Sequence, residues 1–63
     1  MIQAAIERIA DGPRIVLELY EFEGATYEEI ASLIGVPIGT VRSRLSRARR
    51  LLRSELERQG WAA

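Results

Sequence analysis

The feature that most constrains the fold is a row of apolar residues near the end of the chain. They are separated by four, three, four and four positions: Val41, Leu45, Ala48, Leu52 and Leu56. Residues three and four apart share one face of an α-helix, so this spacing predicts a helix over 38–59 with one apolar stripe and arginines around it. No segment alternates with period two over a strand's length, so the sequence predicts an all-α fold.

The same periodicity predicts three shorter helices before the long one, over 2–9, 12–22 and 27–34. Asp11 is a favoured N-cap and Pro13 is tolerated in a first turn, so the second helix is expected to begin near Gly12 or Pro13. The tail 61–63 is expected to fray. The residues predicted to face inward are Ile2, Ala5, Ile6 and Ile9 in the first helix, Ile15, Val16, Leu19, Tyr20 and Phe22 in the second, and Ile30, Leu33 and Ile34 in the third.

The third and fourth predicted helices form a unit with a short turn between them. Thr26 and Glu29 have the spacing of a capping box at the start of the third helix, and Gly35 is the expected left-handed stop at its end. A short helix, a turn with glycine and a longer helix describe a helix–turn–helix. Ala31 is small enough to sit at the crossing, and Val41 is placed to pack the second helix onto the first. The predicted fold class is therefore a small four-helix domain with a helix–turn–helix.

The composition excludes most catalytic chemistry. The chain of 63 residues has no cysteine and no histidine, so it lacks the usual metal ligands and nucleophilic pairs. A chain of this length buries only about 60% of the surface it exposes when unfolded, which leaves no room for a deep catalytic pocket. We therefore expect no enzyme activity, no catalytic residues, no metal and no cofactor. No apolar run reaches the length of a membrane span, so the expected compartment is the cytoplasm.

The formal net charge of zero conceals a strong asymmetry along the chain. Residues 1–35 carry seven acidic residues against two arginines, a net charge of −5, whereas residues 36–63 carry seven arginines against two glutamates, a net charge of +5. One face of the folded domain must therefore be strongly positive, which points to a polyanionic partner. All nine basic residues are arginine, whose guanidinium forks onto phosphate and guanine edges.

Four short strings give the chain a specific family resemblance. They read FEG at 22–24, TYEEIA at 26–31, GVPIGTVRSRL at 35–45 and RAR at 47–49. Over about residues 3–57 the chain resembles region 4 of the sigma-70 family, in the form found in extracytoplasmic-function (ECF) sigma factors. The one departure is at 9–14, where the proline that usually opens the second helix is displaced. The family's other domain is missing from the sequence, so the resemblance implies a C-terminal piece of a longer factor, with 1–63 forming one domain.

The resemblance implies that the chain binds the −35 promoter element and directs RNA polymerase to promoters. In this type of helix–turn–helix, which is winged-helix-like or of the sigma region 4 type, the long last helix is the recognition helix in the major groove. The residues expected to read bases are Arg42, Ser43, Ser46 and Arg47. The residues expected to contact DNA phosphates are Ile38, Gly39 and Thr40 at the start of that helix, with Arg44, Arg49 and Arg50.

The resemblance also implies protein partners. Region 4 of this family docks on the flap tip of the polymerase β subunit. The candidates for that contact are Ile2, Ile6, Ile15 and Leu19, some of which the core needs, and the sequence does not divide the set between the two roles. An anti-sigma factor is a further possible partner, and one reading helix for one element suggests a monomer. Two alternatives remain. One is a protein-interaction module, either a sigma mimic or an anti-sigma target, with incidental DNA binding. The other is a different helix–turn–helix regulator, against which the string at 39–44 argues.

Overall fold

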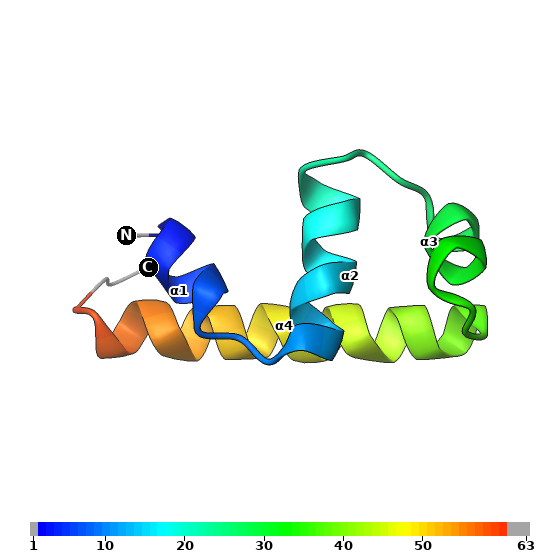
Figure 1. The fold of residues 1–63 in the computed structure, drawn as a ribbon. Coiled ribbons are helices and arrows are strands. Elements are labelled where there is room, and N and C mark those ends of the chain that lie inside the picture. The colour runs from blue at the N-terminus through cyan, green and yellow to red at the C-terminus, as the bar shows by residue number, and fades with distance from the viewer. Residues whose placement is uncertain (1, 61–63) are drawn as a thin grey trace.

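A computed structural model describes residues 2–60, which form four helices and no strand. The helices are α1 (Ile2–Glu7), α2 (Asp11–Glu21), α3 (Tyr27–Ile34) and α4 (Ile38–Arg58). In Figure 1, α4 runs along the whole domain, and α1, α2 and α3 lie on one side of it, over its C-terminal half, its middle and its N-terminal end. The all-α prediction is confirmed, and no β-wing accompanies the helix–turn–helix within these residues. The predicted frayed tail, 61–63, lies outside the described residues.

Helices α1 and α2 differ from the prediction at the junction between them. α1 ends at Glu7, two residues early, and Ile9 closes its last turn by donating its N–H to the carbonyl of Ile6 at 3.0 Å. Asp11 is the first residue of α2 rather than its N-cap, which is Ala10 with no side-chain cap. The expected capping role of Asp11 is therefore wrong. Its Oδ1 instead lies 3.0 Å from Nη2 of Arg14, one turn further along.

The corner between α3 and α4 has the geometry that the sequence predicts. The backbone N–H of Thr26 donates to Oε1 of Glu29 at 2.8 Å, and the N–H of Glu29 donates to Oγ1 of Thr26 at 3.1 Å. Gly35 ends α3 with φ of 71°, a left-handed conformation that costs glycine little. The N–H groups of Gly35 and Val36 both donate to the carbonyl of Ala31, at 2.9 and 3.1 Å. These contacts fix where α4 begins relative to α3.

The core lies between α4 and the three shorter helices. Val41, Leu45 and Ala48 of α4 are fully buried or nearly so, as the apolar stripe predicts. The prediction was wrong for several positions on the shorter helices. Leu17, which was not expected to face inward, is buried, because α2 packs on α4 through only one side of its broad apolar arc. The residues predicted to face inward but found exposed are Ile2, Ile15, Phe22 and Leu33.

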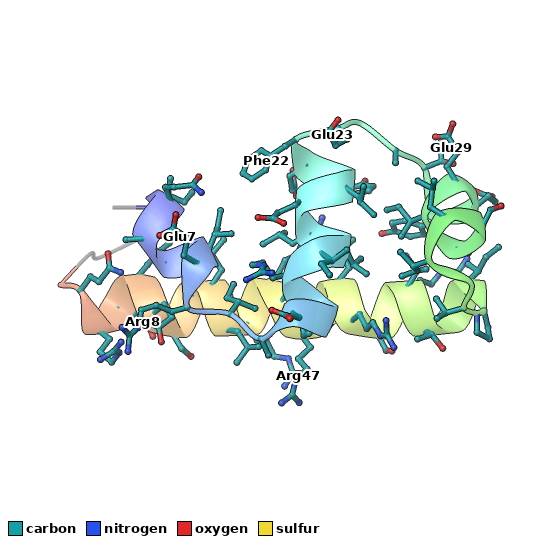
Figure 2. All side chains as sticks on the ribbon, in the orientation of Figure 1. Glu7, Arg8, Phe22, Glu23, Glu29 and Arg47 are labelled. Carbon is teal, nitrogen blue, oxygen red and sulfur yellow. The ribbon has the colours of Figure 1, made fainter. Side chains whose placement is uncertain are left out.

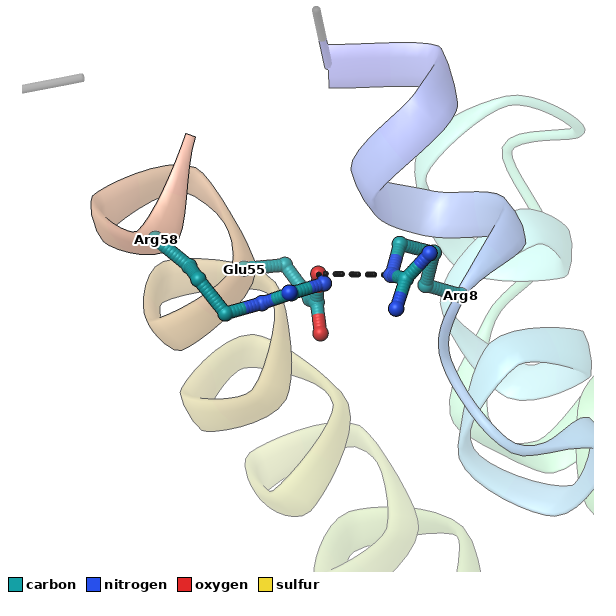
Figure 3. A network of polar contacts seen from close by, with 3 residues as sticks. All are labelled: Arg8, Glu55 and Arg58. Atoms are coloured by element: carbon teal, nitrogen blue, oxygen red, sulfur yellow. Dashed lines mark hydrogen bonds and ion pairs between the residues drawn. The ribbon is translucent and has the colours of Figure 1, made fainter. Parts of the chain in front are cut away.

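A network of three charged residues joins the end of α1 to the last turns of α4 (Figure 3). Nε of Arg8 lies 3.1 Å from Oε2 of Glu55, and Nη2 of Arg58 donates to the same oxygen at 2.9 Å. The hydrogen bond from Arg58 lowers the pKa of the Glu55 carboxyl below its ordinary value of 4.5, and the charges of Arg58 and Arg8 act in the same direction. The network holds α1 against the far end of α4, away from the helix–turn–helix.

Candidate nucleic-acid interface

The four residues predicted to read bases all lie on the solvent-facing side of α4. Arg42, Ser43, Ser46 and Arg47 are exposed, because Val41, Leu45 and Ala48 take the inward positions of the same turns. Figure 2 shows Arg47 pointing away from the other three helices. Among the residues expected to contact phosphates, Gly39 and Arg50 are exposed, and Ile38, Thr40 and Arg44 are half-buried.

Most arginines of α4 have no carboxylate partner. Across residues 2–60, ion pairs within 4.0 Å involve only Arg8, Arg14, Arg49 and Arg58. An unpaired guanidinium keeps its full charge and all its donors available to a ligand. The charge asymmetry of the sequence therefore becomes a positive surface in the fold. We call the arginines without a partner in this part of the chain the free arginine face: Arg42, Arg44, Arg47, Arg50 and Arg53.

Arg49, which is predicted to contact a phosphate, lies against α2 in the structure. Its Nη2 donates to Oε2 of Glu21 at 3.4 Å, and its guanidinium carbon lies 5.6 Å from the centre of the Tyr20 ring. Both partners belong to α2, so Arg49 turns toward the protein while its neighbours on α4 face outward. Sequence reasoning missed this pair because its members lie 28 residues apart.

Arg42 also has an aromatic neighbour. Its guanidinium carbon lies 6.0 Å from the centre of the Tyr27 ring, at the first residue of α3. A cation at this distance from a ring face is attracted by the ring's quadrupole. Unlike Arg49, Arg42 has no carboxylate within 4.0 Å in residues 2–60, so its charge stays uncompensated.

The two serines of the predicted reading set differ in their hydrogen bonding. Oγ of Ser43 donates to the backbone carbonyl of Thr40 at 3.1 Å, one turn earlier on the same helix. This bond occupies the single hydroxyl donor of Ser43 and leaves its oxygen as an acceptor toward solvent. Ser46 makes no side-chain hydrogen bond within the described part of the chain, so its hydroxyl can donate or accept.

The start of α4 is open, in contrast to the capped start of α3. Its N-cap is Pro37, which supplies no side-chain hydrogen bond, and its first turn has no acidic residue. Within residues 2–60 the N–H groups of Ile38 and Gly39 have no acceptor. Helix N-termini of this kind favour anions through free N–H donors and the helix dipole. Apart from its chain neighbours and the backbone of its own helix, a Cβ added at Gly39 would meet no atom within 4 Å, so no other helix blocks an approaching group there.

A second surface lies between α2 and α3, away from the free arginine face. It is an open groove with an apolar floor that includes Ile15, Leu19 and Leu33, and Leu33 is 69% exposed. Its rim is acidic, with Glu18, Glu23 and Glu29, of which Figure 2 labels the last two. Of the residues predicted for polymerase contact, Ile15 and Leu19 line this groove.

The other two residues predicted for polymerase contact lie elsewhere. Ile2 lines a separate small hollow beside Phe22 and Leu52. Ile6 lines the same hollow but is only 2% exposed, so it is one of the candidates that the core uses. Sequence reasoning missed Leu33, because its helical spacing alone does not distinguish an inward residue from one that lines a groove.

No group of three or more histidine, cysteine, aspartate or glutamate side chains in residues 2–60 is arranged to hold a metal ion. No helix in the same residues is both long and apolar enough to cross a lipid bilayer.

The fold and the surface together define a helix–turn–helix domain whose second helix presents a free arginine face. The family described as "Sigma-70, region 4" has a model that matches residues 1–52, so the chain belongs to the sigma-70 region 4 family. The resemblance found in the sequence is thereby confirmed.

Three relatives are RNA polymerase sigma factors, and two of them are named as ECF sigma factors. The chain is 41% identical over 56 residues to the RNA polymerase sigma-H factor of Pseudomonas aeruginosa, covering 89% of this chain and 29% of that protein. It is 44% identical over 55 residues to the ECF RNA polymerase sigma factor SigE of Mycolicibacterium smegmatis, covering 87% and 21%. It is 40% identical over 52 residues to the ECF RNA polymerase sigma-E factor of Escherichia coli K12, covering 82% and 27%. The chain thus spans less than a third of the length of each of these relatives.

Proposed function

We propose that the chain is the promoter-recognition module of a sigma factor and that it binds the −35 element through α4. The observation that carries the proposal is the free arginine face. Five arginines of one helix stay without a carboxylate partner in residues 2–60, although the chain has as many acidic as basic residues. Membership of the sigma-70 region 4 family supports duplex DNA as the polyanion.

In this proposal the N-terminal half of α4 lies in the major groove. Arg42 and Arg47 fork onto guanine O6 and N7, which is the commonest specific contact of arginine with DNA. Ser43 accepts a hydrogen bond from a base through the oxygen that its bond to Thr40 leaves free, and Ser46 donates or accepts. The module performs no chemistry on the DNA.

The phosphate contacts in this proposal flank the reading residues. The open N–H groups of Ile38 and Gly39 donate hydrogen bonds to one phosphate, and Thr40 lies beside them. Arg44 and Arg50 contact other phosphates. Arg49 joins them only after releasing Glu21, which lies 3.4 Å away. Each phosphate neutralised contributes about −0.9 to the slope of log K against log salt concentration, so binding is expected to weaken steeply as salt is added.

The experiment that tests this function is selection of duplexes by the chain from a random pool, followed by titration at several salt concentrations. The expected result is one enriched short motif, a steep salt slope and clear preference over random duplex. Discrimination of no more than a few-fold between the best and the random duplex would contradict the proposal. The same result would favour the alternative of a protein-interaction module.

The groove between α2 and α3 supports a second contact within the same function. Its apolar floor and acidic rim suit an amphipathic helix with basic flanks, a common mode of helix-in-groove recognition. We assign it to RNA polymerase, at the β flap tip, with an anti-sigma factor as a competing occupant. The chain is proposed to act as a monomer, since the one α4 of a single chain is enough to contact one −35 element. With promoter DNA and RNA polymerase as partners, the proposed compartment is the cytoplasm.

A further inference from the structure

Four side chains from three helices form a continuous stack along one flank of α4. The ring centres of Tyr20 and Tyr27 lie 5.3 Å apart at an interplanar angle of 44°. Arg42 lies over Tyr27 at 6.0 Å, and Arg49 lies over Tyr20 at 5.6 Å. We propose that Tyr27 is a positioning residue for Arg42, holding its guanidinium in the direction from which it reads a base pair. This inference rests on the proposed function, because it presumes that Arg42 meets a base.

Tyr27 is held firmly enough to act as a support. It is the first residue of α3, directly after Thr26, whose capping box with Glu29 fixes that end of the helix. Its ring is half-buried, packs against the hydrophobic core and rests on Tyr20. The cap fixes the backbone from which the ring projects, and the ring itself cannot turn without disturbing its contacts with Tyr20 and the core edge.

Arg42, in contrast, has little else to direct it. It is exposed, and no carboxylate in residues 2–60 lies within 4.0 Å of it. A free arginine samples many rotamers and must lose that freedom when it binds a base bidentately. Attraction to the ring of Tyr27 reduces the number of rotamers that Arg42 populates in the DNA-free protein. Arg42 therefore loses less side-chain entropy when it binds a base.

The stack also gives Arg42 and Arg49 different roles. Arg49 has both a ring and a carboxylate, Glu21, which compensates its charge. Arg42 has a ring alone, which orients the guanidinium while leaving its charge and its donors available. A ring without a carboxylate is the arrangement expected for an arginine that must be aimed at a ligand rather than held by the protein.

A purely structural role for Tyr27 makes a different prediction from a positioning role. If the ring only completes the core edge, its loss lowers stability and weakens binding to all duplexes alike. If it aims Arg42, its loss reduces discrimination at the one base pair that Arg42 reads. That base pair is identified independently as the position where Arg42→Ala loses its preference.

The test compares Tyr27→Leu, Tyr27→Phe and the control Tyr20→Leu. Each is titrated with the duplex that the wild-type chain selects from a random pool and with every single-base change of that duplex. Tyr27→Leu is expected to lose roughly 2- to 5-fold in discrimination at the Arg42 base pair, the size of an exposed cation–π contact. Tyr27→Phe retains the ring and is expected to keep the discrimination. Tyr20→Leu removes the neighbouring ring but leaves the Tyr27 ring beneath Arg42, so it is expected to lose less discrimination at that base pair than Tyr27→Leu.

The double variant Tyr27→Leu with Arg42→Ala sharpens the test. If the ring acts through Arg42, the double variant loses no more discrimination at that base pair than Arg42→Ala alone. A uniform loss across all duplexes in Tyr27→Leu, or discrimination lost equally in Tyr20→Leu, would overturn the inference. If Arg42→Ala itself changes no base preference, the reading role of Arg42 in the proposed function fails instead.

A measurement on the unmodified chain covers the case in which Tyr27→Leu does not fold. Nitrogen-15 relaxation of arginine Nε groups in the DNA-free protein reports how restricted each side chain is. Arg42 is expected to be more ordered than Arg50, which has no aromatic ring beneath it among the described residues. Equal order for the two arginines would overturn the inference without any substitution.

Discussion

Arg49 of α4 and Glu21 of α2 form an ion pair with 3.4 Å between Nη2 and Oε2. Both side chains are about half exposed, at 52% and 46%, so the pair contributes little to folding, in the range of about 0–1 kcal/mol. Its larger effect is on charge, because it compensates the one arginine in the 42–50 segment that has a carboxylate partner. The acidic half of the chain thus limits the positive charge that α4 offers to DNA.

Replacing Glu21 by Gln is therefore expected to strengthen DNA binding. The substitution frees Arg49 to contact a phosphate, which steepens the log–log salt slope by about 0.9. Base preference is expected to stay the same, because a phosphate contact carries no sequence information. Salt titration with the preferred and a random duplex measures both quantities. An unchanged slope would mean that Arg49 stays out of reach of the DNA even when it is released.

Gly39→Ala separates folding from binding at the start of α4. Nothing within 4 Å blocks a Cβ there, and alanine suits a helix better than glycine by up to about 1 kcal/mol, so stability should hold or rise slightly. The added methyl group would stand where a phosphate approaches the N–H groups, so affinity should fall for all duplexes alike. Thermal unfolding and gel-shift titration of the same preparation check the two effects. Full affinity in the variant would argue against a phosphate at this site.

Ile30 and Leu33 of α3 are expected to respond in opposite ways to truncation. Ile30 is fully buried against α4, so Ile30→Ala should cost about 2–5 kcal/mol of unfolding free energy. Leu33 is exposed in the groove, so Leu33→Ala should change stability by less than about 0.5 kcal/mol. Urea unfolding of both variants gives the comparison. If Leu33→Ala also weakens capture of the RNA polymerase β flap, the groove is the polymerase contact.

The lowered pKa of Glu55 makes the free energy of unfolding depend on pH. The hydrogen bond from Arg58 lowers the pKa of Glu55 in the folded state. A carboxyl with a lowered folded pKa stabilises the fold above its unfolded pKa, and that contribution is lost as pH falls through the folded value. Between about pH 6 and about pH 3, wild type should therefore lose more unfolding free energy than Glu55→Gln. Urea unfolding across that range checks this, and parallel curves would contradict it.

The order of the helices and the corner of the helix–turn–helix follow from local signals. The stripe of α4, the Thr26–Glu29 cap and the left-handed Gly35 depend on residues within a few positions of one another, and the sequence contains them all. The start of α2 was harder to predict, because Asp11 serves equally well as an N-cap or as a first-turn acid. Neighbouring sequence does not decide between those two positions.

What the sequence could not predict depends on how the helices cross. The apolar arc of α2 is broad, so the burial of Leu17 and the exposure of Phe22 follow only from its angle to α4. The contacts of Arg49 with Glu21 and of Arg42 with Tyr27 join residues far apart in the chain. Among the arginines at 42–53, these contacts leave Arg49 compensated by a carboxylate, Arg42 oriented by a ring, and the others with neither contact within residues 2–60.

Arg47→Ala tests the central claim, that the N-terminal half of α4 reads bases, with Arg47 among the reading residues. The control is Arg53→Ala, the same change on the same helix, at a residue that is also exposed and without a carboxylate partner in residues 2–60 but lies nearly two turns further along. The measurement is the affinity of each variant for the selected duplex and for all its single-base changes. Arg47→Ala should cost roughly 1–3 kcal/mol and lose preference at one base pair, while Arg53→Ala should keep every preference. An Arg47→Ala variant with the full wild-type preference would contradict the account.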